Sequence, residues 1–402
     1  MSSDRMARRQ FLRNGSFGLL LAGLGLPAGD ALAAGKKQKK LPTRVLGRTG
    51  LKIPILSFGV MNSDSPDLIK RALDSGITHL DTANGYLRGN SEKTIGAVLK
   101  ERGGRDKVVI ATKIWLARDF QKGLFTPQDG SWAPGATPEN FARLLDVSLE
   151  RLQSDYVDIL YIHACDNPQM VNYEPMMNAA LAAQKAGKAR FIGVSCHAQV
   201  PEVVRAAVEA KIYDVAEIAF NLWRDDREET KKAIAYAKEN GLGIVAMKTQ
   251  GGNPEEGAAA VNHSAALKWV LQHKEVTTAI PGMTSFDQLD LNLTSVADLD
   301  FNHEEKSYLQ LGALEKGHLC QGCRSCLATC PKGVDIPSLV RAGIYAKRYG
   351  NLSHAEWTLA TLPAQIGLQA CRSCSDCSAV CAHNLDINGS IAALQKQFPF
   401  LA

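Results

Sequence analysis

The sequence predicts an α/β protein whose main part is a (β/α)8 barrel, the TIM-barrel fold, followed by an α-helical domain organised by cysteines. Two observations support this prediction. Residues 55–282 alternate eight times between a short β-branched run and a loop with a helical pattern. Residues 320–381 contain two cysteine runs of identical spacing. A chain of 402 residues with 45% hydrophobic content is long enough for both parts.

The N-terminal residues 1–34 have the features of a signal peptide. The start is basic, residues 17–26 form an apolar run too short to cross a bilayer, and Ala31-Leu32-Ala33 fits an A-x-A cleavage site. The segment Ala7-Arg8-Arg9-Gln10-Phe11-Leu12-Arg13 resembles the twin-arginine export motif. Because that route exports proteins already folded with their cofactors, we expect a periplasmic protein and the twin-arginine export machinery as a partner. An amphipathic anchor is the alternative, and an uncleaved signal would tether the protein to the membrane.

Residues 35–41 follow as a basic, solvated linker. The formal net charge of the chain is +5 at pH 7. The sequence has neither an Arg-rich helix nor an alternation of aromatic and basic residues, so nucleic acid is not an expected partner.

The barrel is expected over residues 42–315. Residues 44–54 place a turn signal between two short apolar runs, which predicts a hairpin capping the N-terminal end of the barrel. Strands are expected at residues 56–60, 78–81, 108–113, 157–163, 191–195, 215–220, 243–247 and 277–280. Helices are expected between them, among others at 66–74, 91–101, 138–152, 201–210, 228–240 and 264–273. An open, doubly wound sheet is the competing arrangement, but the turn after the first strand lacks its Gly-rich phosphate-binding pattern.

Four polar residues stand at or just after strand ends, where the reactive groups of a TIM barrel lie. Asp81, Lys113 and His163 end the second, third and fourth strands, and Tyr86 follows the second. Tyr86 would donate a proton to a carbonyl, and Lys113 would lower the phenol pKa from about 10 toward neutrality. Asp81 would hold Lys113 charged, and His163 would orient the carbonyl. Taken singly, these residues also fit a helix cap, a barrel salt bridge and a buried core histidine.

These residues lie within motifs that resemble the aldo/keto reductases, in order from about residue 42 to residue 295. The motifs are Leu46-Gly47-Arg48-Thr49-Gly50, Leu80-Asp81-Thr82-Ala83 to Tyr86, Ala111-Thr112-Lys113, Tyr161-Ile162-His163, Ile192-Gly193-Val194-Ser195, and Ile280-Pro281-Gly282 with Gln288-Leu289 and Asn292. The resemblance implies a nicotinamide-dependent reduction of a small-molecule carbonyl to an alcohol, or the reverse.

The resemblance also implies a nucleotide site, in which this chain departs from the family. Ser195 matches a residue that holds the nicotinamide carboxamide, but Cys196 follows it where Asn is frequent. Glu217 stands where many members have Gln. Met247, followed by Lys248, stands where the best-known members stack a Tyr on the nicotinamide.

The expected phosphate end of this site is altered too. Gly282 and Gln288 stand where members that prefer NADPH often carry Lys and Arg, and Asn292 completes the expected contacts. A missing charge-assisted contact weakens phosphate discrimination by about 1.5 to 3 kcal/mol. The expected cofactor is therefore NADPH or NADH, with NADPH only slightly favoured.

Residues 116–137 form an insertion after the third strand that contains Phe120, Phe125 and Trp132. We expect it to overhang the barrel mouth as a substrate lid, with Trp115 and Trp223 in the pocket wall. An exposed, decorative loop is the alternative.

The C-terminal residues 316–402 contain an internal duplication with an offset of 51 residues. Each run has the spacing C-x2-C-x2-C-x3-C, as in bacterial two-cluster ferredoxins, where the fourth cysteine of one run ligates the cluster of the other. We therefore expect a helical ferredoxin-like domain with helices at 336–349 and 354–368. Its two 4Fe-4S clusters would be held with crossed ligation by Cys320, Cys323, Cys326, Cys330, Cys371, Cys374, Cys377 and Cys381. A disulfide framework or a zinc site is the alternative.

Two functions follow from these features. The first is an exported oxidoreductase of aldo/keto reductase type whose clusters exchange electrons with a redox partner protein. A nicotinamide moves two electrons as hydride, a cluster moves one, and nothing in the chain signals a flavin to connect them. The clusters would otherwise be structural. The second function is an electron-transfer or binding protein that uses the barrel as a scaffold without nicotinamide turnover.

Overall fold

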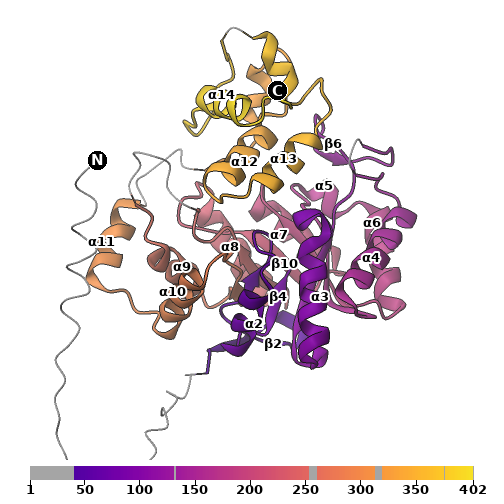
Figure 1. Ribbon diagram of the computed structural model, residues 1–402, viewed down its shortest axis with the longest axis vertical. Coiled ribbons are helices and arrows are strands. Elements are labelled where there is room, and N and C mark those ends of the chain that lie inside the picture. The colour runs from indigo at the N-terminus through magenta and orange to yellow at the C-terminus, as the bar shows by residue number, and fades with distance from the viewer. Residues whose placement is uncertain (1–39, 131–132, 253–259, 313–318, 375, 402) are drawn as a thin grey trace, which may run out of the picture. The chain divides into compact units, whose positions relative to one another are not determined.

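Eight parallel strands curl into a barrel at the centre of the computed structural model (Figure 1). The structure describes residues 40–401 except 131–132, 253–259, 313–318 and 375. The expected signal peptide and most of the expected linker lie outside the described residues. In sheet order the strands are β12 (Thr278–Ala279), β11 (Gly243–Met247), β10 (Val215–Ala219), β9 (Ala189–Cys196), β8 (Val157–Ile162), β5 (Val109–Ile114), β4 (His79–Asp81) and β3 (Phe58–Gly59).

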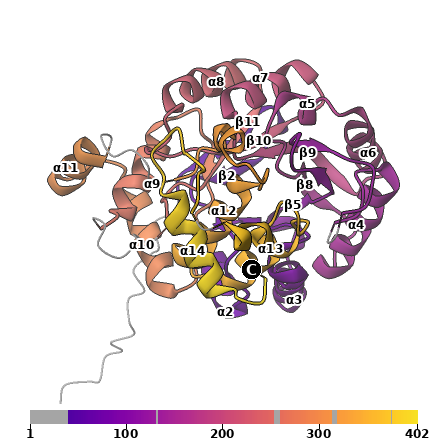
Figure 2. The same cartoon turned by 90° about the horizontal axis from the view of Figure 1, so that it is seen from above.

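The barrel closes between its first and last strands. Parallel bridges join Leu56 to Ala279 and Gly59 to Gly282. The backbone N–H of Ser57 also donates to the carbonyl of Ala279 at 2.9 Å. The predicted (β/α)8 barrel is therefore confirmed, and Figure 2 shows its helices as a ring around the strands.

The helices of the ring begin where the sequence supplies capping residues. The side chains of Ser65 and Thr137 each accept the backbone N–H three residues on, and a proline occupies the first helical turn in both cases. The helices are α2 (Pro66–Asp74), α3 (Asn90–Arg102), α4 (Pro138–Leu152), α5 (Pro168–Val171), α6 (Glu174–Lys185), α7 (Val200–Ala210), α8 (Arg227–Glu239), α9 (His263–Gln272), α10 (Phe286–Ala297) and α11 (His303–Gly312).

The predicted N-terminal hairpin is present and plugs one end of the barrel. Strands β1 (Thr43–Val45) and β2 (Lys52–Pro54) pair antiparallel. Leu46, which follows β1, and Ile53 of β2 are fully buried in the apolar cluster inside the barrel. Gly47 has φ of +48°, and a Cβ there would lie 2.3 Å from the backbone N of Gly243, so the close approach to β11 requires glycine.

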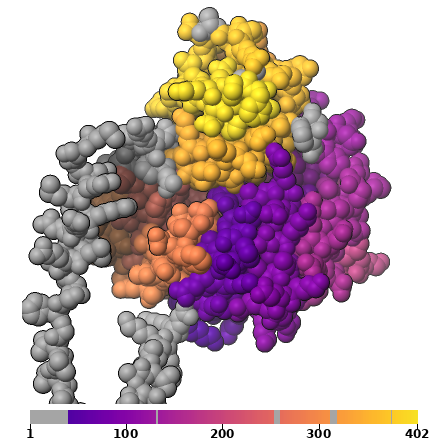
Figure 3. Space-filling model, viewed as in Figure 1, coloured from indigo at the N-terminus to yellow at the C-terminus, as the bar shows by residue number. Residues whose placement is uncertain are grey.

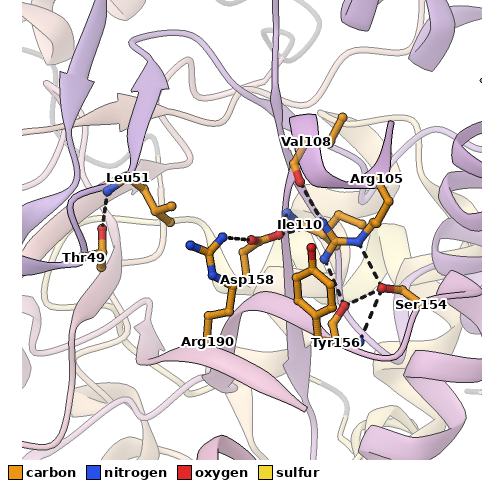
Figure 4. A network of polar contacts seen from close by, with 9 residues as sticks. All are labelled: Thr49, Leu51, Arg105, Val108, Ile110, Ser154, Tyr156, Asp158 and Arg190. Atoms are coloured by element: carbon orange, nitrogen blue, oxygen red, sulfur yellow. Dashed lines mark hydrogen bonds and ion pairs between the residues drawn. The ribbon is translucent and has the colours of Figure 1, made fainter. Parts of the chain in front are cut away.

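A polar network ties the N-terminal ends of β5, β8 and β9 together, away from the barrel mouth (Figure 4). Asp158 is buried and accepts from Arg105 at 2.9 Å, Arg190 at 2.6 Å and the backbone N–H of Ile110 at 2.9 Å. Arg105 also donates to the carbonyl of Tyr156 and stacks on its ring at 4.2 Å. Because the buried carboxylate is fully hydrogen-bonded, this network stabilises the barrel rather than serving chemistry.

The C-terminal domain consists of α12 (Ile336–Lys347), α13 (Leu352–Ala360), α14 (Ile387–Gln397) and the short turns η4 (Ser325–Thr329) and η5 (Leu368–Ser373). Its helices pack around their own apolar core. The domain sits directly on the barrel, over the carboxyl ends of the strands (Figures 2 and 3).

The predicted helix at 354–368 was wrong at its C-terminal end, since α13 ends at Ala360. Pro363 lies three residues beyond and cannot continue a helix. In the described part of the chain, no helix combines the length and apolarity that crossing a membrane requires.

Candidate active site

Lys113 is the centre of the candidate site and is fully buried at the end of β5. Its ammonium group donates to Asp81 of β4 and, at 2.9 Å, to the carbonyl of Thr82. It lies 3.3 Å from Oε2 of Glu217 on β10. Burial opposes the charge of Lys113, but Asp81 and Glu217 raise its pKa above the usual value, so the lysine remains protonated.

Tyr86 and His163 lie beside this lysine. The Lys113 Nζ atom is 5.1 Å from the centroid of the Tyr86 ring, and the Tyr86 and His163 rings are 5.9 Å apart, edge to face. Tyr86 begins the short turn η2 (Tyr86–Gly89), in which Leu87 and Arg88 have positive φ angles of 48° and 56°. The structure thus brings together the four residues predicted to be catalytic, and an irregular backbone positions the tyrosine.

The predicted pKa of Tyr86 was wrong in direction. Burial raises the pKa of the phenol above its ordinary value, and the negative charges of Asp81 and Glu217 raise it further. Lys113 lowers it as expected, but that effect is outweighed. Tyr86 is therefore a neutral phenol and is ready to donate its proton.

Glu217 shares the lysine with Asp81. Burial raises the pKa of Glu217 well above its usual value, and the nearby carboxylate of Asp81 adds to the effect. Ionising both carboxyl groups beside one ammonium is unfavourable, so Asp81 and Glu217 together retain a proton. The glutamine that many aldo/keto reductases have at the position of Glu217 could not hold this proton.

A cleft of about 1030 Å³, including its open side, runs from this group along the barrel rim. Six of the residues predicted to bind the nucleotide line it together with Asp81 and Tyr86. These six are Glu217, Met247, Lys248, Gly282, Gln288 and Asn292.

The other two predicted nucleotide contacts lie elsewhere. The Ser195 hydroxyl accepts the backbone N–H of Ala164 at 2.9 Å and is fully buried. Cys196 is also fully buried. Neither residue lines the cleft. Burial raises the pKa of both Cys165 and Cys196, as expected for thiols that behave as small hydrophobes.

Sequence reasoning missed part of the cleft lining. Gly251 and Gly252 follow β11, and Arg348 and Tyr349 directly follow α12 in the C-terminal domain. The Gly-Gly pair was a recognisable turn signal. Nothing in the sequence pattern of α12 indicated that its end would reach the barrel, because the contact spans about 100 residues.

Lys248 lies where the cleft meets the C-terminal domain. Its ammonium group is 4.8 Å from the Tyr345 ring centroid and 5.1 Å from that of Tyr349. The Lys248 carbonyl oxygen accepts from the side chain of Asn221 at 3.0 Å, but within the described chain the ammonium group has no hydrogen bond or ion pair. Burial lowers the pKa of Lys248 to about 7, and the charge of Arg341 acts in the same direction.

The C-terminal domain covers the barrel mouth, and the insertion packs beside it. The insertion forms a small hairpin of β6 (Arg118–Asp119) and β7 (Leu124–Phe125), and Arg324 binds the carbonyl oxygens at its tip. Trp357 of α13 lies 5.6 Å from Trp115 and against Gly85, where a Cβ would come within 3.3 Å of its ring. The insertion also reaches the mouth, where Arg118 donates to the carbonyl oxygens of Ala164 at 3.1 Å and His163 at 3.3 Å, and its role as a substrate lid stays a prediction.

The predicted aromatic wall is formed only in part. Trp115 lies 5.2 Å from His163, ring centroid to ring centroid. Trp223 packs in a separate apolar cluster with Leu222 and Ala266. Trp132 lies outside the described residues.

The eight C-terminal cysteines fall into two groups, and none of the ten cysteines is in a disulfide. Burial raises the pKa of Cys326 to about 11, and the neighbouring charges of Cys320, Cys323 and Cys381 add to the effect. Burial likewise raises the pKa of Cys371 to about 11, and here the neighbours are Cys330, Cys374 and Cys377. Each group thus takes its fourth member from the other run.

The two runs also contact each other through equivalent residues. The Thr329 hydroxyl accepts the backbone N–H of Val380 at 2.9 Å, and these positions are 51 residues apart. A mononuclear zinc site, with Zn–S bonds of about 2.3 Å, would gather four sulfur atoms within about 4 Å. Among the described residues, no three side chains of the ligand types come close enough to share one ion. The composition of the two groups is the one expected for crossed ligation in a two-cluster ferredoxin.

Comparison with known proteins agrees with this geometry. Residues 56–253 match the sequence model of the aldo/keto reductase family, and residues 319–385 match that of a 4Fe-4S dicluster domain. The chain is therefore an aldo/keto reductase-like, NAD(P)-dependent oxidoreductase with iron–sulfur centres.

Individual relatives cover the barrel. An L-glyceraldehyde 3-phosphate reductase of Escherichia coli O157:H7 is 25% identical over 68% of this chain and 93% of its own length. An L-galactose dehydrogenase of Arabidopsis thaliana is 27% identical over 65% and 90%. The aldo-keto reductase AKR11C1 of Bacillus halodurans, in its holo form, has a TM-score of 0.55 at 23% identity, covering 68% of this chain and 96% of its own.

Proposed function

We propose that this protein reduces a small-molecule carbonyl to an alcohol, with Tyr86 as the proton donor. The observation that carries the proposal is that Tyr86, a neutral phenol lining the cleft, lies beside the buried ammonium of Lys113 and the imidazole of His163. The barrel relatives are named as a reductase of a sugar aldehyde phosphate and a dehydrogenase of a sugar, which supports a small oxygenated substrate.

The cleft fits a nicotinamide dinucleotide. Its volume is about 1030 Å³ including its open side, and Gly251 and Gly252 line it with φ angles of +69° and +75°, leaving room for the rings of Trp223 and Tyr349. Lys248 and Arg348 line it and supply positive charge for phosphates. When bound, the nicotinamide supplies a hydride to the carbonyl carbon.

The residues of the chain carry out the proton transfer. His163 orients the carbonyl oxygen, and the Tyr86 hydroxyl donates its proton as negative charge develops there. Lys113 remains protonated between Asp81 and Glu217 and stabilises that charge. Because burial raises the pKa of Tyr86, reduction starts from the populated form of the phenol, whereas alcohol oxidation would first require its deprotonation.

The first test combines binding and turnover. Purified holoprotein is titrated with NADPH and NADH by fluorescence, and nucleotide oxidation is followed with a panel of small aldehydes and ketones. We expect Tyr86→Phe to keep nucleotide binding and to lower kcat by about a hundredfold or more, because the proton donor is lost. Binding of neither nucleotide would leave the scaffold function as the better explanation, and unchanged turnover in Tyr86→Phe would remove the tyrosine from this role.

For the C-terminal domain, the proposal is two 4Fe-4S clusters with crossed ligation. Cys320, Cys323, Cys326 and Cys381 would hold one cluster, and Cys330, Cys371, Cys374 and Cys377 the other. The grouping of the cysteines in the structure supports this assignment. Bound clusters supply one-electron transfer, so a redox partner protein is part of the proposal.

Export by the twin-arginine route is proposed from the sequence of residues 1–34. Fusing this segment to a reporter protein and replacing Arg8-Arg9 by two lysines tests it. Retention of the lysine variant in the cytoplasm supports the route, and equal export of both fusions contradicts it.

A further inference from the structure

Two imidazoles flank the Tyr86 ring, and only one of them belongs to the barrel. The His163 ring centroid is 5.9 Å from that of Tyr86, with an interplanar angle of 83°. The His354 ring, from α13 of the C-terminal domain, is 5.8 Å away at the same angle of 83°. The phenol therefore has a histidine neighbour from each domain in equivalent edge-to-face contact.

His354 is held rigidly in this place. Its ring stacks on Trp357 at 5.4 Å and 18° and meets Tyr345 edge-on at 4.5 Å. Its backbone N–H donates to the side chain of Asn351 at 2.9 Å. Asn351 in turn donates to the side chain of Asn62 in the barrel at 2.9 Å, so the start of α13 is fixed against the barrel.

The imidazole of His354 has an unused hydrogen-bonding atom. The residue is 6% exposed, and its Nδ1 atom has no partner in the described part of the chain. The Nδ1 atom of His163, a residue that is 7% exposed, also has no hydrogen-bond partner among the described residues. Leaving a buried polar atom unpaired is costly, so two unpaired imidazole nitrogens beside the same phenol call for an explanation, and a hydrogen-bonding ligand is one.

We propose that His354 is a substrate-contacting residue of the barrel's active site, supplied by the C-terminal domain, and that it selects carbonyl compounds with a second oxygen on the neighbouring carbon. The inference rests on the proposed carbonyl reduction. His163 takes the reacting oxygen, and His354 hydrogen-bonds the adjacent hydroxyl or carbonyl oxygen. Trp115 and Trp357, 5.6 Å apart, bound the carbon chain.

The electrostatics support a hydrogen bond rather than an ion pair. Burial lowers the pKa of His354 to about 3, with Lys248 and Arg341 acting in the same direction. The ring therefore stays neutral and can donate or accept. A site that binds a substrate oxygen discriminates strongly against an analogue lacking it, because the site's own polar atom is then left unpaired.

The test compares hydroxyacetone with 2-butanone, which differ only by a hydroxyl in place of a methyl group. The variants are His354→Phe, which keeps an aromatic ring, and His354→Gln, which restores a hydrogen-bonding group. Leu352→Ala, an exposed position on the same helix, is the control. Iron and acid-labile sulfide content verify that each variant keeps its clusters.

We expect wild-type kcat/KM to favour hydroxyacetone. His354→Phe should lower kcat/KM for hydroxyacetone by about tenfold or more and change that for 2-butanone by less than about threefold, and His354→Gln should recover most of the loss. Ligand-observed NMR of both ketones, with oxidised nucleotide so that no turnover occurs, should show the same preference.

The outcomes separate the two proposals. An equal loss for both ketones in His354→Phe, or no preference for hydroxyacetone by either method in the wild type, overturns the role of His354. If the NMR experiment shows a preference for hydroxyacetone that His354→Phe removes, while the kinetic assay with reduced nucleotide shows no turnover of either ketone, the binding role is upheld and the proposed reduction is contradicted.

Discussion

At the scale of single residues, Lys113 illustrates how a charge is kept in a closed barrel. Its ammonium lies between Asp81 and Glu217, and all three side chains are buried. Glu217 stands where many aldo/keto reductases have a glutamine, and the structure shows the effect of the carboxyl group at this position. It adds a second carboxyl beside a single lysine, so its own pKa rises.

Glu217→Gln should therefore stabilise the protein, with a gain that depends on pH. The folded-state pKa of Glu217 lies above its unfolded value, so the folded state binds the proton more tightly and loses stability as pH rises between the two values. Removing the acid should raise the unfolding free energy by about 1 to 2 kcal/mol at pH 8 and by less at pH 5. Urea unfolding at both pH values measures this, and a destabilised variant at pH 8 would contradict it.

Lys248 should make nucleotide binding depend on pH. Because its pKa is lowered to about 7, its cationic form is lost as pH rises through neutrality, and contact with a phosphate needs that cation. The affinity for NADH, which lacks a 2′-phosphate that would titrate itself, should fall by up to about tenfold from pH 6 to pH 8.5. Lys248→Met should bind weakly at both pH values. A similar pH dependence in that variant would assign the effect to another group.

At the scale of elements, the start of α13 both caps the helix and attaches the C-terminal domain to the barrel. Asn351 accepts the N–H of His354 as the helix cap and donates to Asn62 and to the carbonyl of Met61 in the barrel. Arg88 and Glu356 add an ion pair at 3.4 Å between the Tyr86 turn and α13. One helix start thus determines how the C-terminal domain covers the site.

Two substitutions at Asn351 separate these roles. Asn351→Ser keeps a helix-capping oxygen but loses the amide donor to the barrel, whereas Asn351→Ala loses both, and the missing cap should cost about a further 1 kcal/mol of stability. Both variants should expose Trp115 and Trp357 more to acrylamide, and the alanine variant should be the less stable of the two. Unchanged quenching in both variants would show that Asn351 does not hold the C-terminal domain against the barrel mouth.

The helices and strands of the barrel were largely predictable, and their boundaries follow from local rules. Residues 66–74 and 138–152 were predicted as helices at the bounds observed, because a capping hydroxyl and a proline mark each start. The packing of the insertion at 116–137 could not be predicted in the same way. Its Phe120 packs against the core of the C-terminal domain, and that partner is about 200 residues away in sequence.

At the scale of the whole molecule, the two cysteine runs fold as one unit in which each run completes the other. Hydrogen bonds between Thr329 and Val380 and between Lys332 and Ser373 hold the runs side by side. The domain that results also lies over the barrel mouth, so damage to the clusters should reach the active site.

Paired cysteine substitutions test the crossed ligation. Cys320→Ser and Cys381→Ser should each remove about half of the iron, and the double variant should lose no more than either one, because both residues would serve the same cluster. Combining Cys320→Ser with Cys371→Ser should remove nearly all of it. Iron analysis and electron paramagnetic resonance measure these losses. Additive losses for Cys320→Ser with Cys381→Ser would show uncrossed ligation.

The sequence by itself determined the barrel, the four polar residues at its strand ends and the cysteine spacing, because each depends on local periodicity or on ligand spacing within a short segment. The tertiary structure alone decided that the C-terminal domain covers the barrel mouth, that Ser195 and Cys196 lie outside the cleft, and that both His163 and His354 contact the Tyr86 ring. Those outcomes depend on the packing of surfaces from residues far apart in the chain, and such packing leaves no repeating pattern in the sequence.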